Sequence, residues 1–129
     1  MGCNNKNVYA FEKFKAVKHS FDQAVVVAIT DQRGRITFVN DPFCKVSKYS
    51  REELIEQDHS ILYSGYHTKT FYDNIWKLVK CGKEWKGDIC NRTKDGELYW
   101  VQTTIVPFLN KQGKPYRYII SGSCRYMEG

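Results

Sequence analysis

The order of apolar and polar positions along this chain predicts two blocks of strands with helices between them. Apolar and β-branched residues fill positions 24–30 and, after a polar turn at 31–34, positions 35–39, which predicts a β-hairpin. Three more strand-like runs close the chain, at about 84–93, 97–109 and 115–126. Strands joined by short turns pair with one another, so we expect a single antiparallel sheet.

Helical spacing precedes and separates these strands. Residues 8–21 carry apolar side chains three and four positions apart (Phe11, Phe14, Val17, Phe21), which predicts an amphipathic helix whose apolar stripe covers the domain or a second copy. Residues 69–80 repeat the pattern, and Gly82 follows as a helix stop. The fold class is therefore α+β, with helices packed on one face of the sheet.

Short helices are expected between the second strand and the helix at 69–80. Asp41 is a candidate cap, with Pro42 at the first helical position, where its missing N–H does no harm. Ser50 and Glu53 have the spacing of a capping box, which predicts a second short helix through Leu54. Residues 58–68 are polar and predicted to be irregular.

Composition narrows the class of protein. The chain has 129 residues, of which 42% are hydrophobic, enough for one domain with a core. Because no apolar run reaches the roughly 18 residues of a membrane span and no signal peptide is visible, we expect a cytoplasmic protein. Its basic residues (net charge +6) are scattered, which argues against nucleic-acid binding.

Catalytic and metal-binding patterns are lacking in the sequence. Its five cysteines form no C-x-x-C pair, which indicates free thiols rather than disulfides or a zinc site. It has no nucleophile elbow, phosphate loop or metal-ligand spacing, so we do not expect an enzyme.

The segment 85–101 is the most informative part of the chain. It predicts a hairpin around the turn dipeptide Asp95-Gly96. Strand alternation places two sets of residues on one face of the sheet: Trp85, Gly87, Ile89 and Asn91 from the first strand, and Tyr99, Val101, Thr103 and Ile105 from the second. Cys90, Trp100, Gln102 and Thr104 would face the other way, toward the N-terminal helix.

The element order, with the residues that fill it, resembles the PAS family over residues 22–126. Residues 36–40 (Ile-Thr-Phe-Val-Asn), then Phe43 and residues 49–54 (Tyr-Ser-Arg-Glu-Glu-Leu), are similar to the common opening of PAS domains. The resemblance implies a five-stranded antiparallel sheet with short helices on one face and an N-terminal cap helix. It also implies the organisation of the chain: a cap and dimerisation helix at 1–21, a sensor domain at 22–126, and the start of a linker to an output domain at 127–129.

The second half of the chain is similar to the FAD-binding PAS branch of bacterial aerotaxis transducers and nitrogen-fixation redox sensors. The matching motifs are Ile75-Trp76, residues 82–87 (Gly-Lys-Glu-Trp-Lys-Gly), residues 91–96 (Asn-Arg-Thr-Lys-Asp-Gly) and residues 99–101 (Tyr-Trp-Val). His59 also matches a histidine of that branch. Related LOV domains have their flavin-adduct cysteine near this position, and they use arginines for the FMN phosphate where this chain has Ser60 and Trp76.

The resemblance implies a non-covalently bound FAD rather than FMN. An Asn amide offers both donor and acceptor to the polar edge of a flavin, aromatic rings offer stacking, and Gly87 would let the ring approach the sheet. His59 could tune the flavin, because histidine titrates near neutral pH. The expected cofactor-binding residues are His59, Trp76, Trp85, Asn91, Tyr99, Ile89, Thr30 and Phe43. LOV domains have further amides where this chain has Val101 and about Gly122.

The implied function is a sensory domain that responds to redox state, oxygen or light, forms a homodimer through its N-terminal helix, and signals to a fused or partner output domain. Two alternatives remain open at this point. The first is a cofactor-free interaction module in which the aromatic residues only fill the core. The second is a haem oxygen sensor with His67 or His59 as the axial ligand. On the flavin hypothesis, Asn91→Ala and Trp85→Ala should each weaken flavin retention.

Overall fold

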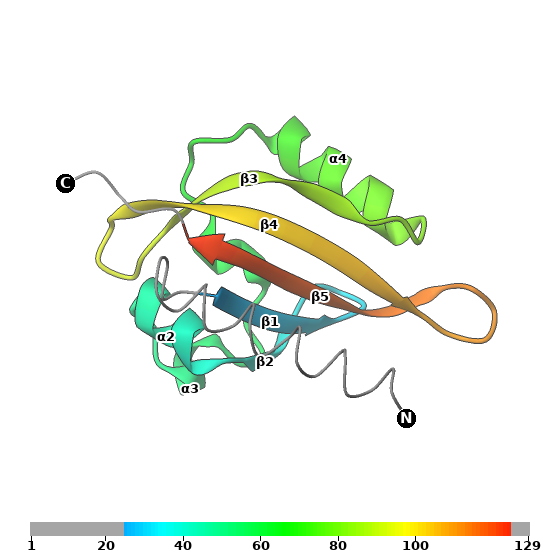
Figure 1. The fold of residues 1–129 in the computed structure, drawn as a ribbon, viewed down its shortest axis with the longest axis horizontal. Coiled ribbons are helices and arrows are strands. Elements are labelled where there is room, and N and C mark those ends of the chain that lie inside the picture. The colour runs from blue at the N-terminus through cyan, green and yellow to red at the C-terminus, as the bar shows by residue number, and fades with distance from the viewer. Residues whose placement is uncertain (1–24, 125–129) are drawn as a thin grey trace, which may run out of the picture.

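The last strand of the chain lies at the centre of the sheet. The computed structural model describes residues 25–124, which form one antiparallel sheet in the order β2-β1-β5-β4-β3 (Figure 1). Its strands are β1 (Val25–Asp31), β2 (Ile36–Val39), β3 (Trp85–Arg92), β4 (Leu98–Leu109) and β5 (Pro115–Cys124). The predicted five-stranded antiparallel sheet is confirmed, and β2 and β3 are its two edges.

The helical elements lie between β2 and β3 in the sequence. They are α2 (Asp41–Ser47), α3 (Arg51–Leu54), the 3₁₀ helix η1 (His59–Leu62) and α4 (Lys69–Lys80). α2 and α3 pack beside β1 and β2, whereas α4 packs against β3 and β4 (Figure 1). The segment predicted to be irregular therefore contains a 3₁₀ turn, which Asp58 caps by accepting from the Ser60 N–H. The helix predicted at 8–21 lies outside the described residues.

Local signals set most helix ends. Ser50 and Glu53 form the predicted capping box, and α4 begins after Thr68, whose hydroxyl accepts from the Phe71 N–H. Gly82 ends that helix region with φ of +87°, a conformation that a side chain disfavours. α4 presents Tyr72, Ile75 and Val79 to the sheet, whereas Phe71 and Leu78, which the helical spacing also places on its apolar face, are only half-buried.

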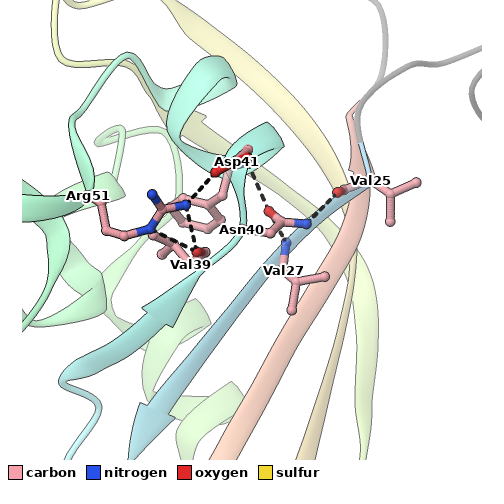
Figure 2. Close-up of polar contacts among 7 residues, drawn as sticks. Val25, Val27, Val39, Asn40, Asp41 and Arg51 are labelled. Atoms are coloured by element: carbon pink, nitrogen blue, oxygen red, sulfur yellow. Dashed lines mark hydrogen bonds and ion pairs between the residues drawn. The ribbon is translucent and has the colours of Figure 1, made fainter.

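Helix α2 has a different N-terminal cap from the one predicted. Asn40, rather than Asp41, caps α2, and Asp41 is the first helical residue. Figure 2 shows the reason. The Asn40 amide nitrogen donates to the Val25 carbonyl at 3.0 Å, and Oδ1 accepts from Val27 N–H at 3.1 Å and from Phe43 N–H at 3.0 Å. One side chain thus joins β1 to α2, a role that depends on tertiary contacts and not on the helix sequence.

Asp41 has a separate role in the same region. Its carboxylate pairs with the Arg51 guanidinium at 2.6 Å, and Arg51 also donates to the Val39 carbonyl at 3.2 Å (Figure 2). The contact holds α3 against the end of β2. Both side chains are exposed, so the ion pair itself adds little stability.

Two apolar clusters fill the space between the helices and the sheet. Phe43, Leu54 and Leu62 from the helical side meet inward residues of β1, β2 and β4 in the first cluster. Tyr72, Ile75 and Val79 of α4 meet inward residues of β3, β4 and β5 in the second. The helical face of the sheet therefore has two cores side by side.

The predicted hairpin at 85–101 is confirmed as β3 and β4. Asn91 pairs with Tyr99 and Trp85 with Ile105, and Gly96 takes φ of +96° in the turn. The tip is attached to the helical layer, because Lys94 N–H donates to the Ser47 carbonyl at 2.9 Å. Lys48 at the end of α2 also forms ion pairs with acidic residues of the tip.

The sequence predicts no membrane-spanning helix and no disulfide, and both can be compared with the described residues. In the range 25–124, no helix has the length and apolar character that crossing a membrane requires. The cysteines of that range, Cys44, Cys81, Cys90 and Cys124, form no disulfide with one another.

Candidate functional site

A small cavity lies where the two apolar clusters meet. Its volume is about 20 Å³, close to the space that one water molecule needs. It is lined by Val26, Phe43, His59, Ile89, Asn91, Tyr99, Val101, Thr103, Ile120 and Ser121. The lining residues come from β1, β3, β4 and β5 and from two helical elements, so the cavity connects most of the fold.

His59 lines this cavity and has an unpaired ring nitrogen. The residue as a whole is partly exposed, but its Nε2 atom is enclosed and has no hydrogen-bond partner. Burial lowers the pKa of His59 from 6.5 to about 4, and the nearby Asp58 carboxylate opposes that effect only in part. The ring of Phe43 meets it edge-on at 6.4 Å. At neutral pH the imidazole is therefore uncharged and can accept or donate one hydrogen bond toward the cavity, depending on its tautomer.

Asn91 and Tyr99 face the cavity from opposite strands of the β3–β4 hairpin. The two residues are direct cross-strand partners and both are buried. Burial raises the pKa of the Tyr99 hydroxyl, while a hydrogen bond from the Asn91 side chain acts in the opposite direction. The Asn91 amide has four hydrogen-bonding positions in total. It can therefore hold Tyr99 and still offer polar atoms to a ligand.

The remaining wall combines two hydroxyl residues, Thr103 and Ser121, with apolar side chains. Thr103 is buried, and its hydroxyl donates to the Val101 carbonyl at 3.0 Å. Ile89 and Ile120 belong to the α4 cluster, and Phe43 belongs to the other. Apolar walls with a few convergent polar groups are typical of a small-molecule site. No three His, Cys, Asp or Glu side chains within residues 25–124 come together in a group that could hold a metal ion.

The structure brings five of the eight sequence-predicted site residues together at this cavity. They are Phe43, His59, Ile89, Asn91 and Tyr99. Thr30 is fully buried in β1 but does not line the cavity, and its hydroxyl donates to the Asp31 carbonyl at 3.0 Å. Trp76 and Trp85 also lie elsewhere, in the α4 cluster.

Trp76 packs α4 against the segment before it and against β5. Its indole N–H donates to the Tyr63 hydroxyl at 3.3 Å, and its ring meets Tyr118 edge-on at 5.3 Å. Its ring also lies 3.7 Å from the position that a Cβ on Gly34 would take. The side chain is thus engaged in packing between α4 and the sheet.

Trp85 covers Gly87 on the same face of β3. A Cβ added to Gly87 would lie 2.6 Å from the indole ring, so the glycine makes room for Trp85. The sequence-based expectation that a ligand ring would use the space at Gly87 is therefore wrong for this conformation. The ring of Phe71 in α4 meets Trp85 edge-on at 6.0 Å and holds it in place.

The outer side of the hairpin also differs from the expectation. Cys90 has the strand phase predicted to face outward, yet it is fully buried. Its neighbour across the sheet, Trp100, meets the rings of Tyr66 and His67 at 5.1 and 5.7 Å. The segment before α4 thus wraps around the edge of β3 and reaches Trp100. Any contact between Trp100 and the N-terminal helix lies outside the described residues.

Sequence reasoning missed part of the cavity wall. Val101 and Thr103 were expected to face inward but were not among the expected cofactor-binding residues, and Val26 and Ile120 were not singled out. β-strand alternation identifies all four as inward-facing once the strands are known. Their position at this cavity depends on the strand order, because β1 and β5 must be neighbours to bring Val26 and Ile120 together.

Known proteins are similar to this chain both in sequence and in fold. Over 96 residues the chain is 33% identical to a nitrogen fixation regulatory protein of Klebsiella pneumoniae, a match that covers 74% of this chain and 19% of that protein. It is 34% identical over 93 residues to the aerotaxis receptor of Escherichia coli K12, which covers 72% of this chain and 18% of the receptor. The chain thus spans about a fifth of the length of these curated relatives.

Solved structures share the fold. A Rhodobacter sphaeroides LOV protein superposes with a TM-score of 0.71 at 17% identity, covering 92% of this chain and 69% of that one. The d2 variant of RsLOV gives 0.72 at 20% identity with the same coverage. The family model described as "PAS domain" matches residues 22–125, most of the chain. With this match, and with the sheet order and cavity described above, the chain belongs to the PAS domain family.

Proposed function

We propose that this PAS domain is a sensory module that binds FAD non-covalently in the cavity between His59 and Asn91. The observation that carries the proposal is that Nε2 of His59 is enclosed without a partner, and that His59 lines the same cavity as Asn91. Unpartnered buried polar atoms cost about 1–3 kcal/mol each. A ligand with a polar edge and apolar faces would supply the missing hydrogen bond.

The size of the cavity sets a condition on this proposal. A drug-sized ligand needs about 300 Å³ or more, whereas the cavity has about 20 Å³. Flavin binding therefore requires that lining side chains move apart. The same observation favours a second candidate function, a cofactor-free PAS interaction module in which the cavity stays closed.

The residues at the cavity suggest how a signal would leave it. When bound, FAD would supply a ring system whose electron and proton content changes with redox state. The Asn91 amide, which also bonds Tyr99, would then exchange one hydrogen-bond partner for another. Asn91 lies in the edge strand β3 and bridges Tyr63, so its movement would reach both the hairpin and the segment before α4.

Neither histidine is well placed for the haem alternative. The Nε2 of His67 already accepts a hydrogen bond from the Cys90 N–H at 2.9 Å, and His67 does not line the cavity. His59 does line it, but the cavity of about 20 Å³ would have to widen for a haem as well. FAD is proposed over FMN because the resemblance to LOV domains implies Ser60 and Trp76 at the places of their FMN-binding arginines.

The wider role is inferred in the same way. We infer that the domain is cytoplasmic, regulatory rather than catalytic, dimeric through the segment at 8–21, and linked to an output domain that responds to redox state, oxygen or light. Equilibrium sedimentation of the whole chain tests the dimer. A monomer at high concentration would contradict that part of the proposal without affecting the cofactor.

The cofactor itself is tested by absorption spectra and by titration of the purified chain with FAD and with FMN. Flavin bands after purification, or a rise in melting temperature with FAD, are the expected results. Asn91→Ala should weaken FAD binding about tenfold, in line with the loss of about 1–2 kcal/mol of hydrogen bonding. Asn74→Ala, at an exposed position of α4, is the matched control and should leave binding unchanged. A chain that binds neither flavin supports the cofactor-free alternative.

A further inference from the structure

The segment from residue 56 to residue 67 is attached to both edges of the sheet. We call it the strap. Its first end pairs with β2 through the main chain: Glu56 N–H donates to the Ile36 carbonyl at 2.7 Å, and Ile36 N–H donates to the Gln57 carbonyl at 2.9 Å. His59 N–H adds a third bond to the Gly34 carbonyl at 3.0 Å. The strap then crosses the helical face, where His59 lines the cavity, and ends at β3.

The second end of the strap is attached by two side-chain hydrogen bonds and by one isolated main-chain bridge. The Ser64 hydroxyl donates to the Cys90 carbonyl at 2.8 Å, and the Cys90 N–H donates to Nε2 of His67 at 2.9 Å. Tyr63 forms an isolated bridge with Asn91 beside these bonds. Both main-chain polar groups of Cys90 on the open edge of β3 are thus satisfied by the strap.

The two ends differ in how easily they can separate. The β2 end is continuous main-chain pairing, whereas two of the contacts at β3 depend on the rotamers of Ser64 and His67. Gly65 lies between these residues with φ of +88° and has no other atom within 4 Å of the position of a Cβ. A glycine in open space can change its backbone angles at little cost. The β3 end is therefore the part of the strap that can open.

We propose that residues 63–67 are a latch on β3, and that its release from Cys90 opens the cavity between His59 and Asn91 to a ligand. The part of this proposal that concerns FAD rests on the function proposed above. The cavity must widen before a flavin fits, and the latch lies against Asn91 at its wall. When the latch opens, the strap moves away from β3, and Tyr63 gives up part of its packing against the α4 cluster.

Histidine makes this latch sensitive to pH. His67 can accept from the Cys90 N–H only while its Nε2 is unprotonated. The titratable groups in contact with it are Tyr66 of its own segment, Tyr72 of α4 and Cys90 of β3, and the other neighbours are the rings of Phe71 and Trp100. Burial lowers the pKa of His67 below 6.5. The latch is closed at neutral pH and opens as the pH falls through that pKa.

Amide hydrogen exchange of the flavin-free chain tests the latch directly. In His67→Leu, which removes the acceptor, the protection factor of the Cys90 amide should fall at least about fivefold, the equivalent of one ordinary hydrogen bond. His67→Gln keeps a side-chain acceptor and should retain part of the protection. Thr37→Val removes a side-chain bond at the other edge of the sheet and is the matched control. Equal losses at Cys90 and at Ala28 in the core would indicate global destabilisation and overturn the proposal.

Access to the cavity is measured without FAD. Thr103→Cys places a thiol at the buried cavity wall, and its alkylation by iodoacetamide, followed by peptide mass spectrometry, should be at least about fivefold faster when combined with His67→Leu. The parent latch should show the same acceleration when the pH falls below the pKa of His67, after correction for thiol ionisation. Unchanged alkylation with an exposed Cys90 amide would show that the latch does not control access. FAD association rates are measured separately. A chain that binds no flavin would refute the proposed function, while the exchange and alkylation results would still test the latch.

Discussion

The enclosed imidazole of His59 predicts a specific loss of stability in acid. The pKa of His59 is about 4 in the folded chain against 6.5 when exposed. Below pH 6.5 the unfolded state therefore binds a proton that the folded state refuses, and stability falls as the pH falls from about 6.5 to about 4. At about 1.4 kcal/mol per pKa unit, the loss at pH 4 is about 3 kcal/mol. This is a large part of the stability of a domain of this size.

The test compares the flavin-free parent with His59→Gln, which does not titrate. Urea unfolding at intervals from pH 7.5 to pH 4 gives the free energy of unfolding of each protein. Carboxylates such as Glu53, whose pKa is lowered by Lys94, and Asp95, whose pKa is lowered by the Thr93 hydroxyl and then by Lys48, also cost stability in acid. They are present in both proteins, so the difference between the two curves isolates His59. The gap should change by about 3 kcal/mol between pH 7.5 and pH 4.

Two results would refute this reasoning. Parallel curves for parent and variant would mean that Nε2 of His59 is solvated in the folded chain. An NMR titration of the His59 ring with a midpoint near 6.5 would mean the same. A bound ligand that pairs with Nε2 should change the midpoint, which connects this measurement to the proposed cofactor site.

Three further predictions concern packing. Gly87→Ala should lower the free energy of unfolding by about 1–3 kcal/mol, because its Cβ would meet the indole of Trp85. In a Trp85→Ala background, urea unfolding should show a cost of less than about 0.5 kcal/mol for the same change. Equal costs in both backgrounds would contradict the contact. Asn40→Ala should lower the free energy of unfolding by about 2–3 kcal/mol, because three hydrogen bonds are lost. Asp41→Ala removes an exposed ion pair and should cost less than about 1 kcal/mol. Similar losses for the two variants would contradict the assignment of Asn40 as the cap of α2. Tyr72→Phe removes a buried hydroxyl that has no hydrogen-bond partner; burial raises the pKa of this hydroxyl to about 12. Calorimetry should therefore show an unchanged or higher melting temperature. A marked drop in melting temperature would mean that the hydroxyl has a partner.

The elements were predictable where the signal is local. The capping box at Ser50, the helix stop at Gly82 and the turn at Gly96 each depend on a few neighbouring residues, and the structure has all three. Alternation along β3 and β4 also placed Ile89, Asn91 and Tyr99 on the face that lines the cavity. Such patterns survive folding because they express the geometry of a strand or helix by itself.

The errors came where distant segments decide. Asn40 caps α2 because its amide also reaches β1, so the sequence of the helix alone favoured the wrong residue. Cys90 is buried because the strap covers the edge of β3, which alternation cannot indicate. Trp85 lies over its own strand neighbour Gly87, and the expected space for a ligand there is filled. Each of these depends on tertiary packing rather than on local pattern.

The central position of β5 has a consequence for how the domain is made. β1 pairs with β5 along its whole length, and β5 also pairs with β4, so the strand that joins the two halves of the sheet is synthesised last. Until residues 115–124 emerge from the ribosome, the chain has two separate hairpins with open inner edges, which attract other chains. Premature termination before residue 115 should therefore yield an aggregating fragment instead of a smaller stable domain.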